Sequence, residues 1–315
     1  MKKKLLGKTG LKVTELCFGA LPMGPLQKNL PEEEAAEILS IALQGGVNFI
    51  DTAQGYKTYG PIRLALKTIK ERPIIASKSP AETYGEMQQA VDQALNNLGL
   101  DELDIFHLHA ARAGEDVFAK RRGALECLLD NKRQGRIRAI GISTHSVKVT
   151  ALASTREEID VVFPIMNKQG LGLLEGNREE MERAIAQCVT KGKGVYLMKV
   201  LAGGSLVGDY DQALDYARSL PGCSSIAIGM VTREEVEYNL AYFEGRRPES
   251  LPSLEAMKKR FLVVKSLCAG CLKCVDVCPN HAIISVEGKA LIQEEKCLTC
   301  GYCVGVCPQF AIRLV

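Results

Sequence analysis

Residues 47–56 read VNFIDTAQGY, a short apolar run that ends abruptly in polar side chains. An apolar run of this length is typical of a buried strand and is too short for a helix. The segment before it, PEEEAAEILSIALQGG (31–46), begins with proline, ends with glycines and has helical periodicity. A helix that leads directly into a buried strand predicts parallel units of alternating strand and helix.

The same alternation continues from about residue 16 to residue 230, with a second clear helical segment in ETYGEMQQAVDQALNNLG (82–99). Strands that alternate with helices favour a parallel sheet, and eight such units predict a closed (β/α)8 TIM barrel. An open doubly wound sheet is the structural rival. It would place a G-x-G-x-x-G turn after its first strand, and CFGALPMG (17–24) does not supply one. The eight expected strand segments are ELCFGA (15–20), VNFIDTA (47–53), PIIASK (73–78), LDIFHLH (103–109), IRAIGIS (137–143), IDVVFPIM (159–166), GVYLMKV (194–200) and SSIAIGM (224–230).

Composition sets the remaining limits. The chain has 315 residues, of which 46% are hydrophobic and 24% charged, which is enough for one large and one small globular domain. No run approaches the roughly 18 to 20 apolar residues of a membrane helix, and MKKKLLGKTGLKV (1–13) lacks the apolar core of a signal peptide. A net charge of +3 comes with no recognisable nucleic-acid motif. We therefore expect a cytoplasmic protein with neither a membrane nor a nucleic acid as partner.

Eight of the twelve cysteines lie in two similar segments near the C-terminus, CAGCLKCVDVCP (268–279) and CLTCGYCVGVCP (297–308). Both have the spacing C-x2-C-x2-C-x3-C-P, which is typical of bacterial iron–sulfur ligands. Disulfides and zinc are the alternatives. A zinc site has no need of the third cysteine and the proline, so the repeated spacing favours 4Fe-4S clusters. The other four cysteines, Cys17, Cys127, Cys188 and Cys223, are scattered along the chain.

In such segments the fourth cysteine ligates the other cluster. The first cluster is expected to use Cys268, Cys271, Cys274 and Cys307, and the second cluster Cys297, Cys300, Cys303 and Cys278. Between the two segments, AIISVEGKALI (282–292) predicts a β-hairpin around residues 287–289. From about residue 265 to the end, the chain resembles the two-cluster bacterial ferredoxins.

These features predict three parts of the chain. Residues 1–247 are expected to form the barrel, and residues 263–315 a small α+β ferredoxin-like domain. A charged linker and a short helix are expected over 248–262, with the helix placed in LEAMKKRFLVVK. This tail is expected either to lie over the mouth of the barrel or to dock elsewhere.

Polar residues stand where several predicted strands end, and barrel enzymes place their chemistry at these carboxyl ends. Asp51 and Tyr56 follow the second strand, Lys78 ends the third and His109 ends the fourth. Together they can make a proton donor of the Tyr56 phenol, provided that Lys78 lowers its pKa and Asp51 keeps the lysine charged. His109 is then placed to orient a carbonyl oxygen. His107, on the same face of its strand, is expected to be a hydrogen-bonded core residue.

Each of these residues also has a purely structural interpretation when taken alone. Asp51 can cap the next segment, Tyr56 can pack at the rim, and a lysine after a strand is commonly solvated. Their joint occurrence at strand ends is what favours catalysis.

Five segments in order resemble the aldo-keto reductase family over about residues 5–244. They are FIDTAQGY (49–56), IIASK (74–78), LDIFHLHA (103–110), GRIRAIGIST (135–144) and SIAIGMVTREEVEYNL (225–240). The resemblance implies NAD(P)-dependent carbonyl reduction, with Tyr56 as general acid. It also implies that Lys78 and Asp51 tune this phenol and that His109 positions the substrate.

The same resemblance implies a set of nicotinamide contacts. Thr144 stands where the family commonly has Asn, and Phe163 stands near a usual Gln, for which Asn167 can compensate. Glu235 falls where many members place an Arg for the 2′-phosphate, which favours NAD over NADP because a carboxylate repels that phosphate. No flavin motif is visible. The residues expected to bind the cofactor are Gly19, Ser143, Thr144, Asn167 and Asn239.

Hydride transfer moves two electrons together, whereas each cluster passes one electron at a time. Three functional hypotheses follow. The barrel performs hydride chemistry on a small carbonyl or alcohol substrate, while the clusters exchange electrons with a redox-protein partner or a flavin. Alternatively, the barrel binds a carbonyl compound that receives single electrons from the clusters. In the third hypothesis the protein is a non-catalytic electron-transfer or redox-sensing protein.

Overall fold

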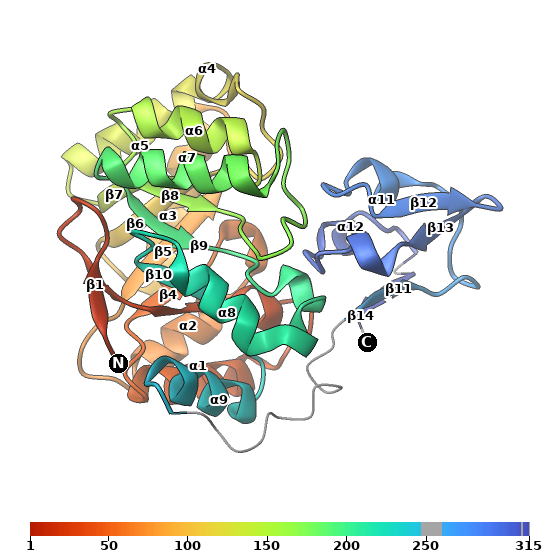
Figure 1. Ribbon diagram of the computed structural model, residues 1–315, viewed down its shortest axis with the longest axis horizontal. Helices are drawn as coiled ribbons and strands as arrows, with labels where there is room; N and C mark the ends of the chain where they lie inside the picture. Colours follow the sequence, from red (N-terminus) through yellow and green to blue (C-terminus); the bar gives the residue numbers. More distant parts are fainter. Residues whose placement is uncertain (247–259, 310, 315) are drawn as a thin grey trace.

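A computed structural model describes residues 1–246, 260–309 and 311–314. Eight parallel strands close into a barrel in the order β10-β3-β4-β5-β6-β7-β8-β9 (Figure 1). Each strand coincides with one of the eight predicted apolar runs, although β5 and β7 extend one residue beyond theirs. The predicted barrel is therefore confirmed and the open sheet is wrong. The strands are β3 (Leu16–Gly19), β4 (Phe49–Asp51), β5 (Ile74–Ser79), β6 (Leu103–His109), β7 (Ile137–Thr144), β8 (Val161–Pro164), β9 (Gly194–Leu197) and β10 (Ser225–Ile228).

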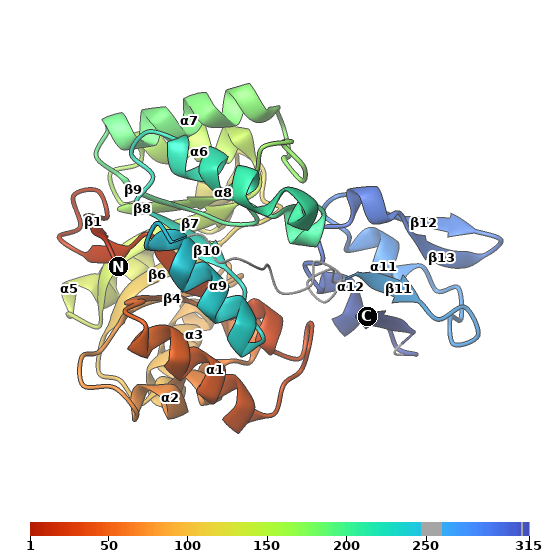
Figure 2. The same ribbon diagram turned by 60° about the horizontal axis from the view of Figure 1, so that its bottom comes forward.

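Helices surround the barrel and bury their apolar faces against it (Figure 2). The predicted segment 82–99 forms α3, which begins with a capping box between Thr83 and Glu86 and ends at Gly99, whose φ of 70° is left-handed. The predicted segment 31–46 forms α1, which ends at Gly45. The helices of the barrel are α1 (Glu32–Gln44), α2 (Tyr59–Leu66), α3 (Tyr84–Leu98), α4 (Val117–Lys120), α5 (Arg122–Arg133), α6 (Val147–Thr155), α7 (Arg178–Thr190), α8 (Tyr210–Ser219) and α9 (Arg233–Phe243), with short 3-10 helices η1 (Leu21–Met23), η2 (Gln54–Tyr56), η3 (Ala202–Gly204) and η4 (Val207–Asp209).

A hairpin that the sequence did not reveal closes the amino-terminal end of the barrel. Its strands are β1 (Lys3–Leu5) and β2 (Lys12–Thr14). Leu6 and Leu11 of this hairpin are buried and join Phe49 and Tyr196 in the core inside the barrel. The hairpin thus excludes water from the end of the barrel opposite the carboxyl ends of the strands.

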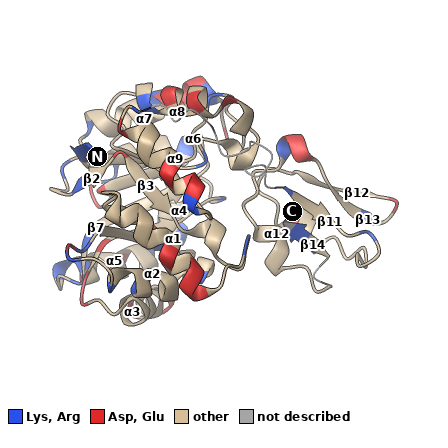
Figure 3. Cartoon of the chain, turned by 90° about the horizontal axis from the view of Figure 1, so that it is seen from below, with Lys and Arg blue, Asp and Glu red and all other residues tan. Residues whose placement is uncertain are grey.

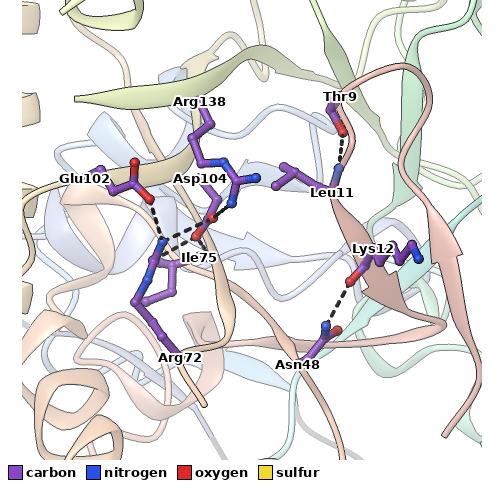
Figure 4. Close-up of polar contacts among 9 residues, drawn as sticks. All are labelled: Thr9, Leu11, Lys12, Asn48, Arg72, Ile75, Glu102, Asp104 and Arg138. Atoms are coloured by element: carbon purple, nitrogen blue, oxygen red, sulfur yellow. Dashed lines mark hydrogen bonds and ion pairs between the residues drawn. The ribbon is translucent and has the colours of Figure 1, made fainter. Parts of the chain in front are cut away.

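Polar side chains at the same end are paired with one another (Figure 4). Asp104, near the start of β6, accepts hydrogen bonds from Arg72 Nη1 at 2.8 Å and from Arg138 Nη1 at 2.9 Å. Asp104 also accepts from the backbone N–H of Ile75 at 2.9 Å and from Arg72 Nη2 at 3.2 Å. These bonds hold the starts of β5, β6 and β7 together, because Arg72 and Ile75 belong to β5 or the loop before it and Arg138 belongs to β7.

The C-terminal domain is a small α+β unit. It comprises β11 (Phe261–Val263), α11 (Lys273–Asp276), β12 (Ile283–Val286), β13 (Lys289–Ile292), η5 (Glu294–Lys296), α12 (Tyr302–Gly305) and β14 (Ile312–Leu314). The predicted hairpin is confirmed, with Val286 paired to Lys289 across a turn at Glu287 and Gly288. Both turn residues have positive φ, 49° and 73°, as a two-residue hairpin turn of type I′ requires.

The short helix expected in residues 254–265 is wrong where it can be compared. Residues 254–259 lie outside the described residues, and residues 261–263 form β11. This strand pairs antiparallel with β14, and Phe261 is buried in the core of the C-terminal domain. Pairing with a strand 50 residues later in the chain overrides the helical pattern.

The C-terminal domain lies at the carboxyl ends of the barrel strands (Figures 1 and 2). Hydrogen bonds that join the two parts include Gln27 Nε2 to Thr299 O at 2.5 Å and Arg112 Nη1 to Asp276 O at 3.3 Å. Of the two placements expected for the tail, the described C-terminal domain takes the one at the barrel mouth; the predicted linker, residues 248–253, lies outside the described residues.

The outer surface of the barrel carries charged residues of both signs along its helices (Figure 3). No helix in the described ranges is both long enough and apolar enough to span a bilayer.

Candidate active site

The structure brings the four predicted catalytic residues together at the carboxyl ends of β4, β5 and β6. Lys78 Nζ donates hydrogen bonds to Asp51 Oδ2 at 2.6 Å and to Thr52 O at 2.8 Å. The same Nζ lies 4.7 Å from the centre of the Tyr56 ring. The rings of Tyr56 and His109 meet edge to face, with their centres 6.1 Å apart. One small region therefore holds a phenol, an ion pair and an imidazole.

Strand register explains why these side chains converge. Lys78 on β5 is paired with His107 on β6, and His109 is paired with Ser143 on β7. Side chains two residues apart on a strand point to the same face, so His107 and His109 both face the barrel interior, His107 one layer deeper.

A buried hydrogen-bond chain supports the site from below. The Tyr196 hydroxyl donates to Asp51 Oδ1 at 3.0 Å and lies 2.8 Å from His107 Nε2. Because the single phenolic proton is given to the carboxylate, His107 must donate from Nε2 to the Tyr196 oxygen. The expected hydrogen-bonded core role of His107 is confirmed. Asp51 is thereby fixed by Lys78 on one oxygen and by Tyr196 on the other.

Tyr196 was missed from the sequence. It lies inside the apolar run GVYLMKV, where a tyrosine is ordinary, and its partner Asp51 is 145 residues away. Phe163 stacks on the Tyr196 ring, with centres 3.8 Å apart and planes at 11°. Phe163 therefore packs against Tyr196 and helps to hold the buried hydrogen-bond chain in position.

The sequence-based expectation that Lys78 lowers the pKa of Tyr56 is wrong in direction. Burial raises the pKa of Tyr56 well above its usual value, and the nearby Tyr302, Asp51 and Cys300 add to the rise. The Lys78 ammonium lies over the Tyr56 ring and is bonded to Asp51 and Thr52, but it does not outweigh the effect of burial. The phenol is consequently held protonated, as a proton donor needs to be.

Burial also governs the other ionisable groups of the site. It raises the pKa of Asp51 and lowers that of Lys78, although the ion pair between them opposes both changes. Burial, with Lys78 next in effect, lowers the pKa of His107 and His109 well below their usual value. Both imidazoles are therefore neutral around pH 7.

An open cavity of about 980 Å³, measured out to its solvent-facing edge, adjoins the site and is lined by Asp51, Tyr56 and Phe163. Of the five residues expected to bind the cofactor, Gly19 and Asn239 line this cavity.

The other three expected contacts are placed differently. Ser143 Oγ is buried beside His109 and has no hydrogen-bond partner among the described residues. Thr144 Oγ1 accepts from the backbone N–H of Ser146, and the Asn167 side chain bonds both backbone groups of Leu171. The Ser143 hydroxyl thus remains available for a ligand, whereas the Thr144 hydroxyl and the Asn167 amide are bonded to backbone groups close by in the chain.

The two expected cysteine sets each surround a small cavity of the C-terminal domain. One cavity is lined by Cys268, Cys271, Cys274 and Cys307. The other is lined by Cys278, Cys297, Cys300 and Cys303. Both lining sets include the exchanged fourth cysteine that the spacing predicts.

All twelve cysteines are free of disulfide bonds. In the described ranges, no three or more His, Cys, Asp or Glu side chains are spaced to hold a single metal ion. The thiols are instead arranged around two cavities, and thiolates are the ligands that iron–sulfur clusters use.

Comparison with known proteins identifies both parts of the chain. The sequence model of the Aldo/keto reductase family matches residues 15–244, and that of a 4Fe-4S dicluster domain matches residues 261–308. The chain belongs to the aldo/keto reductase family. It is thus an oxidoreductase whose reductase barrel is followed by an iron–sulfur domain.

Individual relatives agree with this assignment. L-galactose dehydrogenase of Arabidopsis thaliana is 24% identical over an alignment of 314 positions. The alignment covers 81% of this chain and 93% of that protein. Pyridoxine 4-dehydrogenase of Escherichia coli is 32% identical over 174 residues, which cover 48% of this chain and 58% of that protein. A crystal structure of an aldo-keto reductase from Pseudomonas aeruginosa has a TM-score of 0.65 at 23% identity, covering 77% of this chain and 95% of that one. That structure supports the fold.

The iron–sulfur domain contributes a residue to the reductase site. The Tyr302 hydroxyl lies 3.2 Å from His109 Nε2, and the two rings have centres 6.5 Å apart. Tyr302 stands between Cys300 and Cys303, so a cluster-binding loop touches the imidazole that was expected to face a substrate. Its local sequence gave no signal for this role, because the two residues are 193 positions apart.

Proposed function

We propose that the protein catalyses NAD(P)-dependent interconversion of a small carbonyl compound and its alcohol, and that two 4Fe-4S clusters exchange electrons with a redox-protein partner. The observation that carries the proposal is the buried contact of Lys78 Nζ with Asp51 Oδ2 at 2.6 Å, directly over the Tyr56 ring. Membership of the aldo/keto reductase family supports the same conclusion.

Each residue of the site has a defined part in carbonyl reduction. A bound nicotinamide would supply the hydride. Tyr56 donates its phenolic proton to the substrate oxygen as the C=O π bond opens, and the raised pKa keeps that proton in place beforehand. Lys78 stabilises the phenolate that is left, and Asp51 holds the ammonium in position.

His109 contributes orientation to this reaction. It is neutral, so its one N–H can point either to a substrate oxygen or to Tyr302. The Tyr302 contact at Nε2 limits the space beside His109, which favours small carbonyl substrates. In this chain Tyr302 therefore stands beside the imidazole that, in the family, usually contacts the substrate directly.

The cavity beside Tyr56 fits a nicotinamide cofactor. Ser143 Oγ is a buried hydroxyl without a partner in the described residues, beside His109, as a carboxamide contact needs. Asn239, which lines the cavity, accepts a hydrogen bond from the Tyr210 hydroxyl at 2.8 Å. Glu235 lines the cavity as well, and its carboxylate favours NAD over NADP because it repels a 2′-phosphate.

One observation favours a second candidate function. The second cysteine set lies next to the reductase site, since Tyr302 between two of its cysteines contacts His109. A carbonyl compound bound there is placed to receive single electrons from a cluster without nicotinamide. This hypothesis predicts turnover with a chemical one-electron donor alone.

The test is an anaerobic titration of the full chain with both clusters loaded. Calorimetry should show binding of NADH that is tighter than that of NADPH. NADH consumption should then follow addition of compounds from a panel of small aldehydes and ketones. If neither nicotinamide binds, the proposal fails. Turnover that proceeds with dithionite-reduced clusters and no nicotinamide supports the second candidate instead.

A further inference from the structure

The segment Leu298–Tyr302 of the iron–sulfur domain is built into the reductase barrel. Leu298 is only 2% exposed and packs within the barrel's own hydrophobic core. Gly172 and Gly203 make room for it, since a Cβ on Gly172 would lie 2.0 Å from Leu298 Cδ1 and one on Gly203 2.2 Å from the Leu298 carbonyl. Both parts of the chain are therefore shaped for this contact.

Polar contacts fix the same segment. The Thr299 hydroxyl donates to the Gly203 carbonyl, and the Thr299 carbonyl accepts from Gln27 Nε2 at 2.5 Å. Leu298 and Thr299 lie between Cys297 and Cys300, two ligands of the second cysteine set. The second cluster is thus the one that faces the barrel.

The first cysteine set is placed differently. Each set has one buried cysteine, Cys274 or Cys303, but only the first set has an exposed one, Cys271. A redox partner in solution can approach the first cluster directly, while the second cluster is reached through the first or from the barrel side.

Lys199 brings a positive charge to the second cluster from the barrel side. It follows β9 by two residues and lines the same cavity as Leu298 and Thr299. Burial lowers the pKa of Lys199, and the neighbouring Cys300 and Cys297 oppose that change, so the side chain lies within electrostatic reach of two cysteines of the second set. Its φ of 56° is left-handed, a conformation that costs about 1 kcal/mol or more for a residue other than glycine and persists only where the surroundings require it.

We propose that Lys199 raises the reduction potential of the second cluster, so that an electron delivered to the iron–sulfur domain resides preferentially at the end that faces the reductase site. Reduction adds one negative charge to a cluster, and a nearby cation in a poorly solvated setting stabilises that charge. In the internal step the first cluster loses one electron and the second gains one, with no bond or proton changed. The inference rests on the proposed electron-transfer role of the clusters and is independent of nicotinamide chemistry.

The test is a redox titration of the anaerobic, cluster-loaded full chain, followed by electron paramagnetic resonance. Lys199→Gln removes the charge and keeps a polar side chain of similar reach. The second cluster should become about tenfold harder to reduce relative to the first, which for one electron corresponds to a fall of about 59 mV. Cys300→Ser identifies which of the two signals belongs to the second cluster.

Lys70→Gln is the matched control, because Lys70 is an exposed lysine before β5, at the opposite end of the barrel. It should leave both potentials unchanged. The inference is overturned if Lys199→Gln shifts neither potential, or if it shifts both by the same amount. None of these outcomes depends on carbonyl reduction, so they remain distinct from failure of the proposed function.

Discussion

The two ends of the barrel each bury an aspartate against a cation, but the groups around the two pairs differ. At the amino-terminal end, Asp104 is bonded by Arg72, Arg138 and the Ile75 amide, so its oxygens are fully used inside the protein (Figure 4). At the carboxyl end, Asp51 and Lys78 are bonded equally well, yet they adjoin a cavity. The Tyr56 phenol lies at this end as well, and the Ser143 hydroxyl there has no hydrogen-bond partner among the described residues.

This difference separates a structural ion pair from a chemical one. The polar groups at the amino-terminal end satisfy one another, whereas those at the carboxyl end leave polar groups unused beside a cavity, as we propose for a ligand site. A buried ion pair alone is therefore weak evidence of catalysis. Stronger evidence comes from neighbouring polar groups that have no partner inside the protein and that adjoin a cavity.

The largest effect is expected from Lys78→Met. This change removes the charge beside Tyr56 and leaves Asp51 buried without its cation, which costs about 3 to 5 kcal/mol of folding free energy. Carbonyl reduction per folded molecule should fall by roughly 10² to 10⁴-fold, measured as NADH consumption at matched cluster content. Arg138→Met is the matched control, since Asp104 keeps Arg72. Equal activity losses in the two variants would contradict the distinction between the two ends.

Asp104→Asn should show the reverse pattern. It weakens charge-assisted bonds to two arginines and should lower the free energy of unfolding by about 2 to 3 kcal/mol, measured by urea denaturation. Activity per folded molecule should stay within about twofold, because Asp104 lies at the end of the barrel opposite the site and shares no partner with it. A large loss of turnover in the folded fraction would show that the amino-terminal end takes part in function.

Ser143→Ala should weaken NADH binding about tenfold, which corresponds to one lost hydrogen bond of about 1.4 kcal/mol. Stability should not fall, because the Ser143 hydroxyl has no partner among the described residues. Ser154→Ala is the control, since that hydroxyl bonds its own helix at Ala151 O. Unchanged calorimetric affinity for NADH in Ser143→Ala would remove Ser143 from the cofactor site.

The smallest expected effect is a pH dependence of stability. Burial, with Lys199 and Arg112 adding to it, lowers the pKa of His145 to about 3, whereas an unfolded histidine titrates near 6.5. Below about pH 6.5 the unfolded chain binds a proton that the folded chain does not, so stability falls by about 1.4 kcal/mol per pH unit for this residue. His145→Asn should flatten the slope between pH 6.5 and 5.5 in urea titrations. An unchanged slope would show that His145 takes up a proton in the folded state.

Much of this architecture could be predicted because it depends on local patterns. Apolar runs located all eight barrel strands, and polar residues at the ends of those runs located Asp51, Tyr56, Lys78 and His109. The cysteine spacing predicted the crossed sets that line the two cavities. Each of these signals is contained within a few neighbouring residues.

The rest could not be predicted because it depends on distant contacts. Tyr196 is defined by a partner 145 residues away, Tyr302 by one 193 residues away, and β11 by pairing with β14. The direction of the Tyr56 pKa change was also wrong, because burial and the neighbouring Tyr302 belong to the tertiary structure. Contacts between residues far apart in the chain, both within each domain and between the two domains, thus decide the features that the sequence does not reveal.

The most direct test of the account is the rate of carbonyl reduction by Tyr56→Phe, compared with wild type at equal iron and sulfide content. The phenol is assigned as the proton donor, so its loss should reduce turnover by at least about 10²-fold while NADH binding and both cluster signals persist. Turnover equal to that of the wild type would show that the proton comes from another group and would contradict the assignment of this end of the barrel as a tuned acid site.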